Sequence, residues 1–347
     1  MGSCITKTAN VEDGLPPIPF PDFSYLRRAK KSVLTIKNKS VQKEHVRGLV
    51  EIRNDAGIGL TSLQKIILVG GTDESAQLTS RVVQLDPVNS IYHYIQDLPV
   101  PAKKGFIQEF EGWLYYVGGL VKNPDVESPH NFIPSPLMRL NLASSHWEVL
   151  ETAQETRADG EKTINYRNLY QPGTFIHGSK MYLVGGQVIN PDTNEAVPNK
   201  KIYSIDLQSP DLILLDEDVK LKMHANHPIC VLNKNDSVVQ IFGGKTSDMR
   251  LFRNNFEVNL DTKEIKETQP FPFFVKEHYP PIYQKEYTII ISFPKIAVQR
   301  VGYHDWKVFD FKREDEVQKN QEYLKAVGKG LEERKEPERH NINTKSP

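Results

Sequence analysis

The feature that most constrains this chain is a recurring apolar segment that stops at two glycines. It occurs four times, as KIILVGG (65–71), WLYYVGG (113–119), KMYLVGG (180–186) and VVQIFGG (238–244). Continuous runs of β-branched and aromatic residues of this length predict strands buried on both faces. A fifth segment, YTIIISF (287–293), has the strand without the glycines. The chain is therefore expected to consist of copies of one β unit.

The paired glycines are expected to be structural. Two consecutive glycines allow a backbone turn that side chains would obstruct. The predicted structural glycines are Gly70, Gly71, Gly118, Gly119, Gly185, Gly186, Gly243 and Gly244.

A second apolar segment follows each copy and ends in Asp or Asn. The equivalent positions are Asp86, Asn141, Asp206, Asn259 and Asp310, which lie 55, 65, 53 and 51 residues apart. Short Asp and Asn side chains bond to nearby backbone groups, so these residues are expected to form the turn that ends each strand.

Further segments on either side complete a unit of four antiparallel strands. The predicted first strands are VRGLVEI, GFIQEF, GTFIH, HPICVL and PIYQ, and the predicted fourth strands are IYHYIQDL, HWEVL, ILLDE and KEIKE. The period is close to the roughly 50 residues of a kelch repeat. Together with Trp147 in one fourth strand, these features resemble kelch repeats, although the fifth copy lacks glycines and the second and third copies carry insertions.

The resemblance implies an all-β fold, a kelch-type β-propeller over residues 33–312. Five blades are expected, with six as the alternative if residues 149–171 contain a decayed copy. The last copy, ending KVFDFKRED, has no evident fourth strand, and residues 33–36 are expected to supply it. Closing the ring with a strand from the other terminus would remove an exposed sheet edge.

Residues 1–32 are expected to be a Pro-rich tether that carries lipid. Gly2 follows Met1 in the pattern of N-myristoylation, with Thr6 at the required hydroxyl position, and Cys4 stands where a palmitoyl chain could be added. Two acyl chains anchor a protein stably, whereas one gives marginal binding. Residues 313–347 are charge-rich and are expected to form a helical tail that frays into disorder.

Composition excludes several classes of function. Lys plus Arg and Asp plus Glu both number 44, so no general attraction to nucleic acid is expected. The two cysteines, Cys4 and Cys230, favour a reducing compartment over a disulfide framework. No run approaches the roughly 20 apolar residues of a membrane span. These properties predict a cytoplasmic protein held peripherally on a membrane.

Candidate chemical sites are few, and no cofactor, metal site or catalytic residue is predicted. His224, His227 and Cys230 lie three residues apart, and on a strand such steps alternate between faces, so the three would not converge on a metal. Residues 121–137 and 153–170 form the longest polar loops, and they are either a recognition surface or neutral insertions.

The leading hypothesis is a non-enzymatic scaffold that binds a protein partner through its loops. The alternative is a small-molecule enzyme, an isomerase or oxidase, that acts in the propeller channel. That activity would need polar residues gathered at the channel mouth, and the isolated candidates are Arg139, His177, Arg250 and His304.

Overall fold

The computed structural model describes residues 23–27, 32–37 and 40–45, and then residues 53–310 with internal gaps. The gaps are residues 64, 87–88, 90, 126–130, 151–168, 190–194, 210–213, 234–236, 247, 249, 276–278, 285, 293–294 and 304. The predicted lipidation sites Gly2 and Cys4, the Pro-rich segment up to residue 22, the tail 313–347 and His304 lie outside the described residues. All regular elements of the described chain are strands in antiparallel sheets, as expected for an all-β fold consistent with a β-propeller.

Five of the sheets have four strands each, and we number them in chain order. Sheet 1 contains β4 (Gly57–Leu60), β5 (Ile66–Val69), β6 (Val82–Asp86) and β7 (Ile91–Ile95). Sheet 2 contains β9 (Phe106–Phe110), β10 (Trp113–Val117), β13 (Leu137–Asn141) and β14 (His146–Leu150). Sheet 3 contains β16 (Gly173–His177), β17 (Lys180–Val184), β20 (Lys201–Asp206) and β21 (Leu214–Lys220).

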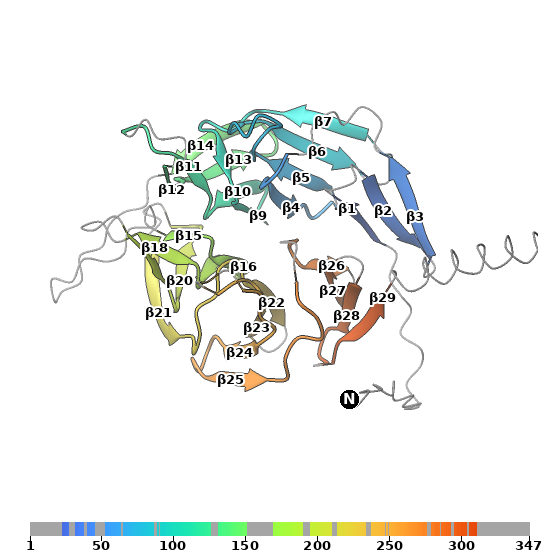
Figure 1. Cartoon of the computed structure of the whole chain (residues 1–347), viewed down its shortest axis with the longest axis vertical. Helices are drawn as coiled ribbons and strands as arrows, with labels where there is room; N and C mark the ends of the chain where they lie inside the picture. The colour runs from blue at the N-terminus through green and yellow to red at the C-terminus, as the bar shows by residue number, and fades with distance from the viewer. Residues whose placement is uncertain are drawn as a thin grey trace, which may run out of the picture.

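Sheets 4 and 5 repeat the same order of strands. Sheet 4 contains β22 (Ile229–Asn233), β23 (Val238–Phe242), β24 (Asn255–Asn259) and β25 (Ile265–Thr268). Sheet 5 contains β26 (Ile282–Gln284), β27 (Tyr287–Ser292), β28 (Lys295–Arg300) and β29 (Lys307–Asp310). The five sheets lie around a common centre, from blue and cyan at the top to orange below (Figure 1).

Three further sheets have three strands each. The first consists of β1 (Phe23–Arg27), β2 (Ser32–Lys37) and β3 (Ser40–His45). The second consists of β8 (Ala102–Lys103), β11 (Leu120–Lys122) and β12 (Phe132–Pro134). The third consists of β15 (Leu169–Tyr170), β18 (Gln187–Ile189) and β19 (Ala196–Pro198).

The core is divided into five apolar clusters, and each draws buried side chains from two of the four-stranded sheets. One member from each side illustrates the pairs: Val69 and Leu114 for sheets 1 and 2, Val117 and Leu183 for sheets 2 and 3, Val184 and Ile241 for sheets 3 and 4, Phe242 and Ile290 for sheets 4 and 5, and Leu68 and Ile291 for sheets 5 and 1. Neighbouring residues of one strand, such as Leu68 and Val69, thus face different sheets. This explains why the glycine-ended strands are apolar at every position.

Most of the Asp and Asn residues predicted to end a strand do cap a turn. Asn141 Oδ1 accepts the N–H groups of Ala143 and Ser144, both at 2.9 Å. Asp206 Oδ1 accepts Gln208 N at 3.1 Å. The same role is filled by Asn259, through Asp261 N and Thr262 N, and by Asp86, through Asn89 N.

The predicted ring closure is wrong. Residues 33–36 lie in β2, which pairs with β1 and β3 and not with sheet 5. Sheet 5 is complete without them, because Lys295–Arg300 forms its third strand and Lys307–Asp310 its fourth. Asp310 is therefore not equivalent to the other strand-ending residues; it pairs with Lys295. The third strand follows β27 after only two residues, where the other copies have a longer connection.

The inner strand of sheet 1 also differs from the prediction. Residues 46–50 of the expected strand lie outside the described residues, as do 51 and 52, and β4 (Gly57–Leu60) takes its place. Two glycines in four residues give β4 little strand propensity. The structure supplies the reason for one of them: a Cβ on Gly59 would lie 2.3 Å from Ile107 Cβ of sheet 2. Close approach of the two inner strands thus requires glycine there.

Candidate partner-binding face

The glycine doublets all lie at one end of sheets 1–4, which we call the doublet face. At this end the same three segments pair in each sheet: one before the first strand, one directly after the doublet, and one before the third strand. In sheets 2 and 3 they form the three-stranded sheets β8–β11–β12 and β15–β18–β19. In sheets 1 and 4 the same segments are joined only by isolated β-bridges among the described residues. Thr72 pairs with Asn54 and Leu78, and Lys245 pairs with Asn226 and Leu251. The doublet face therefore carries two additional three-stranded sheets, one beside sheet 2 and one beside sheet 3.

The doublets mark the places where one sheet meets the backbone of the next. Gly70 has φ +60°, and a Cβ there would lie 2.1 Å from the carbonyl oxygen of Ala102. Its neighbour Gly71 donates its N–H to the same oxygen at 2.7 Å. Gly186 N does the same with Ala225 O at 2.8 Å. Backbone contact of this kind leaves no room for a side chain.

One residue just before the first strand of each of sheets 1–4 adopts the left-handed conformation, although none is glycine. These residues are Asp55, Lys104, Gln171 and His227, with φ of 57°, 59°, 55° and 52°. Lys104 N donates to Asp55 O at 2.7 Å, and His227 N donates to Gln171 O at 2.9 Å. The conformation is unfavourable for side chains of this kind and persists where the surroundings fix it.

The four left-handed residues line a cavity of about 120 Å³ at the centre of the doublet face. Lys245, Asn226 and Phe106 also line it. Lys104 Nζ lies 3.9 Å from Asp55 Oδ2, so one cation is partly balanced, while Lys245 adds a second positive charge. The cavity is small, its wall has both polar and apolar surface, and its lining residues belong to or adjoin sheets 1 to 4.

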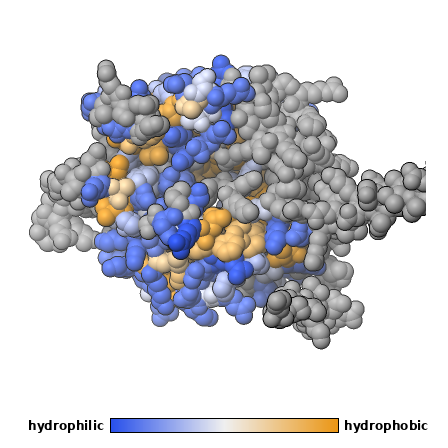
Figure 2. Space-filling model, viewed as in Figure 1, coloured by the Kyte–Doolittle hydropathy of each residue, from blue (hydrophilic) through white to orange (hydrophobic). Residues whose placement is uncertain are grey.

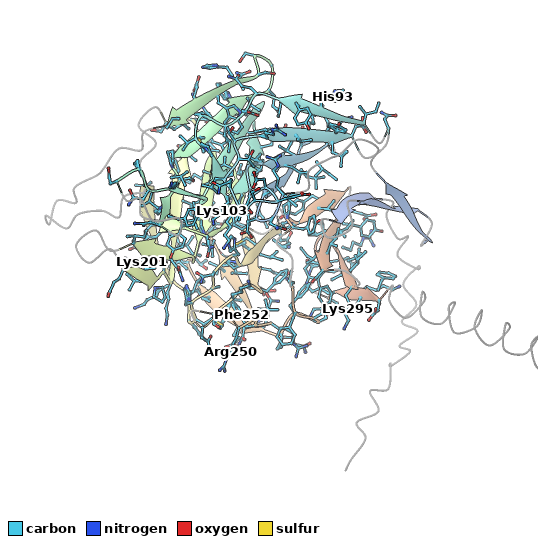
Figure 3. The ribbon with its side chains drawn as sticks, turned by 45° about the horizontal axis from the view of Figure 1, so that its top comes forward. His93, Lys103, Lys201, Arg250, Phe252 and Lys295 are labelled. Atoms are coloured by element: carbon cyan, nitrogen blue, oxygen red, sulfur yellow. The ribbon has the colours of Figure 1, made fainter. Side chains whose placement is uncertain are left out.

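Lys104 and Lys245 lie in the wall of this cavity, and Lys103 precedes Lys104 in the chain. Lys103 Nζ sits 3.5 Å from the centre of the Phe132 ring, which ties β8 to the edge strand β12. Burial, followed by the charge of Lys104, lowers the pKa of Lys103. Burial also lowers the pKa of His224, whose Nε2 lies 2.9 Å from Gly186 O. Figure 3 labels Lys103 of β8, Lys201 of β20 and Arg250 in the connection between β23 and β24.

The described parts of the two predicted recognition loops lie on this face. Residues 121–137 form the hairpin of β11 and β12, in which Val121 pairs with Ile133, except for residues 126–130. Of residues 153–170, only Leu169 and Tyr170 are described, and they form β15. Sequence reasoning missed the hairpin of β18 and β19, whose outer strand is exposed along its length, with Val197 47% exposed. The sequence feature that could have revealed this hairpin is the length of the connection after Gly186.

The three described residues that were considered for channel chemistry, Arg139, His177 and Arg250, each have separate neighbours. Arg139 pairs with Glu148 at 2.8 Å and lies over the Trp113 ring, and Arg250 is exposed beside Asp248. His177 is at the end of β16, paired with Lys180. None of the three lines the cavity of the doublet face.

Of the three residues considered as metal ligands, only Cys230 lies on a strand, β22; His224 and His227 precede it, so the expected alternation of strand faces does not apply to them. His227 lines the cavity of the doublet face, whereas Cys230 lines a larger cavity at the opposite end of the sheets. Among the described residues, no group of three His, Cys, Asp or Glu side chains is placed to hold a metal ion. The described part of the chain likewise has no helix of the length and hydropathy needed to cross a bilayer.

Comparison with known proteins adds no assignment. No protein-family model matches the chain, and no curated protein is significantly similar to it.

Proposed function

We propose that the five four-stranded sheets are the blades of a five-bladed, kelch-type β-propeller. The proposal is supported by the apolar clusters, since each sheet shares one with two others and sheet 1 shares one with sheet 5. The recurring glycine doublets support it as well, because four of the five units place them at the same end.

The propeller serves as a non-enzymatic scaffold that binds a protein partner through the doublet face. The observation that carries this proposal is the pair of additional three-stranded sheets, β8–β11–β12 and β15–β18–β19, on the same face as the cavity. β12 and β19 are edge strands, each paired on one side among the described strands, and β19 is exposed at all three residues, which suits recognition of another chain. Lys104 and Lys245 in the cavity wall favour a partner with acidic side chains at the contact.

The scaffold is held on the cytoplasmic face of a membrane by acylation of Gly2 and Cys4. This part of the proposal rests on the sequence motif, in which two acylation sites lie two residues apart. Mass spectrometry of the mature N-terminus tests it, with membrane fractionation of wild type, Gly2→Ala and Cys4→Ser. Release of Gly2→Ala into the soluble fraction is expected, and an unmodified N-terminus would contradict the anchor.

Partner binding is tested by placing a photo-crosslinking amino acid at Val197, on the exposed strand β19, in cells. The matched control is Val149, which is 44% exposed on β14, the fourth strand of sheet 2. A discrete crosslinked species from position 197 that is missing from position 149 is expected. The same pattern from both positions, or none from either, would rule out the doublet face as the binding surface.

A further inference from the structure

A second and larger cavity opens at the end of the sheets opposite the doublet face. Its volume is about 530 Å³, within the range of ligand-binding cavities in proteins. All five four-stranded sheets contribute to its wall. One lining residue from each, in sheet order, is Leu60, Phe110, Phe175, Leu232 and Tyr283. Figure 2 shows hydrophobic surface near the middle of the molecule in one view, bordered by hydrophilic side chains.

The charge of this cavity is entirely negative. Glu109 and Glu111 are the carboxylates among its described lining residues, and no Lys, Arg or His is among them. The two other ionisable groups of the wall are neutral at physiological pH, because burial raises the pKa of the Cys230 thiol and of the Tyr283 hydroxyl. The cavity of the doublet face, by contrast, contains Lys104, Lys245 and His227.

Neutral groups hold the two carboxylates in place. Glu109 accepts Ser62 N at 2.5 Å on one oxygen and Ser62 Oγ at 2.9 Å on the other. Glu111 Oε1 accepts Gln208 Nε2 at 3.3 Å. A carboxylate has about four acceptor positions, so both groups retain lone pairs for a further donor. In the described part of the chain, no cation pairs with either of them.

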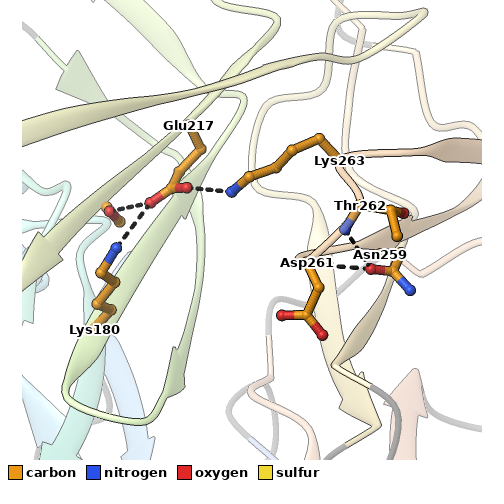
Figure 4. Close-up of polar contacts among 7 residues, drawn as sticks. Lys180, Glu217, Asn259, Asp261, Thr262 and Lys263 are labelled. Atoms are coloured by element: carbon orange, nitrogen blue, oxygen red, sulfur yellow. Dashed lines mark hydrogen bonds and ion pairs between the residues drawn. The ribbon is translucent and has the colours of Figure 1, made fainter.

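A third carboxylate shows how the chain treats an acid that serves structure alone. Glu217 accepts Ser204 Oγ and lies 2.5 Å and 3.5 Å from the ammonium groups of Lys263 and Lys180 (Figure 4). Its charge is thus balanced within the protein. The charges of Glu109 and Glu111 are left without such balance beside a cavity, where a bound cation would gain from them.

The remaining wall suits the stem of a long cationic side chain. Phe110, Phe175, Pro280 and Pro281 give it apolar surface, and the Gln108 amide is fixed by a 2.8 Å hydrogen bond to Thr174 Oγ1. Leu63, which is 77% exposed, follows the lining residue Ser62 in the chain and is an exposed apolar side chain. Two carboxylates and two aromatic rings favour a guanidinium over an ammonium ion, since the planar group donates to both acids and stacks on rings.

We propose that this cavity binds an arginine side chain presented by a peptide segment of a protein partner. The site lies at the opposite end of the sheets from the doublet face. Its occupancy therefore does not depend on the partner-binding surface proposed above, and the two can be tested separately.

Calorimetric titration of the full chain with the peptide acetyl-Leu-Arg-Leu-amide tests the proposal. Versions with citrulline, lysine or leucine in place of the arginine are the matched probes. Citrulline has nearly the same shape without the charge, so its affinity is expected to be at least about tenfold lower. The lysine peptide is expected to bind more weakly than the arginine peptide. Lysine binding as tight as arginine, equal binding of citrulline, or no binding of the arginine peptide would overturn the proposal.

Variants then connect the binding to the two carboxylates. The double variant Glu109→Gln/Glu111→Gln is expected to lose about tenfold or more in affinity for the arginine peptide. Glu264→Gln, which removes an exposed acid outside the cavity, should leave it unchanged. If the double variant does not fold, Glu111→Gln replaces it, because the hydrogen bond from Gln208 is the one bond to that carboxylate in the described part of the chain. An unchanged affinity in the double variant, or in Glu111→Gln where that variant replaces it, would overturn the proposal.

Discussion

Lys263 Nζ lies 2.5 Å from Glu217 Oε2 and so connects the turn between β24 and β25 of sheet 4 to the outer strand of sheet 3. The carboxylate is only 10% exposed, while the ammonium group is 38% exposed. Burial raises the pKa of Glu217, but hydrogen bonds from Lys263 and Ser204, with the charges of both lysines, outweigh this and hold the pKa below its ordinary value.

The first prediction concerns the contribution of this contact at different pH values. A carboxyl whose pKa is lower in the folded state stabilises the fold at neutral pH, and the contribution disappears as the pH falls below about 4 through the folded-state pKa. Glu217→Gln is expected to lower the free energy of unfolding by about 1 kcal/mol at pH 7, discounted for the exposure of the lysines. The difference from wild type should vanish in acid. Urea unfolding of wild type and variant at several pH values between 3 and 7 measures this difference in free energy. Glu264→Gln is the neutral control.

The second prediction separates strain from crowding at glycine. Gly70 and Gly112 both have positive φ, of 60° and 79°, but a Cβ would meet Ala102 O at Gly70 and nothing within 4 Å at Gly112. Gly112→Ala should cost about 1 kcal/mol for the backbone conformation alone. Gly70→Ala should cost at least about 3 kcal/mol, since the carbonyl must move as well. Equal losses in urea unfolding would show that the contact between sheets does not limit this position.

The third prediction concerns Trp147, whose side chain links sheet 2 to the end of sheet 1. The indole is 5% exposed, and its Nε1 donates to Gln96 O at 2.7 Å. Trp147→Phe removes this bond and leaves a void, so a loss of about 2–4 kcal/mol in unfolding free energy is expected. Chemical denaturation followed by circular dichroism provides the value. A loss below about 1 kcal/mol would mean that the two sheets pack independently of this residue.

The fourth prediction concerns thiol reactivity. Cys230 is 3% exposed, and burial raises the pKa of its thiol, so the reactive thiolate is strongly disfavoured. In a Cys4→Ser variant, Ellman's reagent should detect no thiol in the folded protein and one after unfolding in denaturant. Rapid labelling of the folded variant would place Cys230 in contact with solvent.

Much of the fold follows from strand patterns in the sequence, because a strand buried on both faces needs apolar residues at successive positions. The strands around Leu114, Leu183 and Ile241 are of this type, and each lies between two apolar clusters. The prediction failed where this signal is weak. The inner strand GIGL of sheet 1 is shaped by its contact with Ile107, and the third strand of sheet 5 was hidden because no glycine doublet precedes it.

The candidate sites were harder to predict because they depend on contacts between units. Both polar loops were chosen from length and composition, and the structure places their described parts on one face. The cavity beside Glu109 and Glu111 could not be predicted. Its walls come from the five inner strands of five sheets, and nothing in the spacing of those strands along the chain indicates that their ends meet.

The cluster shared by sheets 1 and 5 has a consequence for synthesis of the protein. Leu68 belongs to the same buried cluster as Ile289 and Ile291, which follow it by more than 200 residues in the chain. At ordinary translation rates, one apolar face of sheet 1 therefore stays uncovered for roughly 10 to 45 s while the other sheets are made. The nascent chain leaves that face uncovered, as a surface for chaperones or for aggregation, until the strand that carries Ile289 and Ile291 has been made.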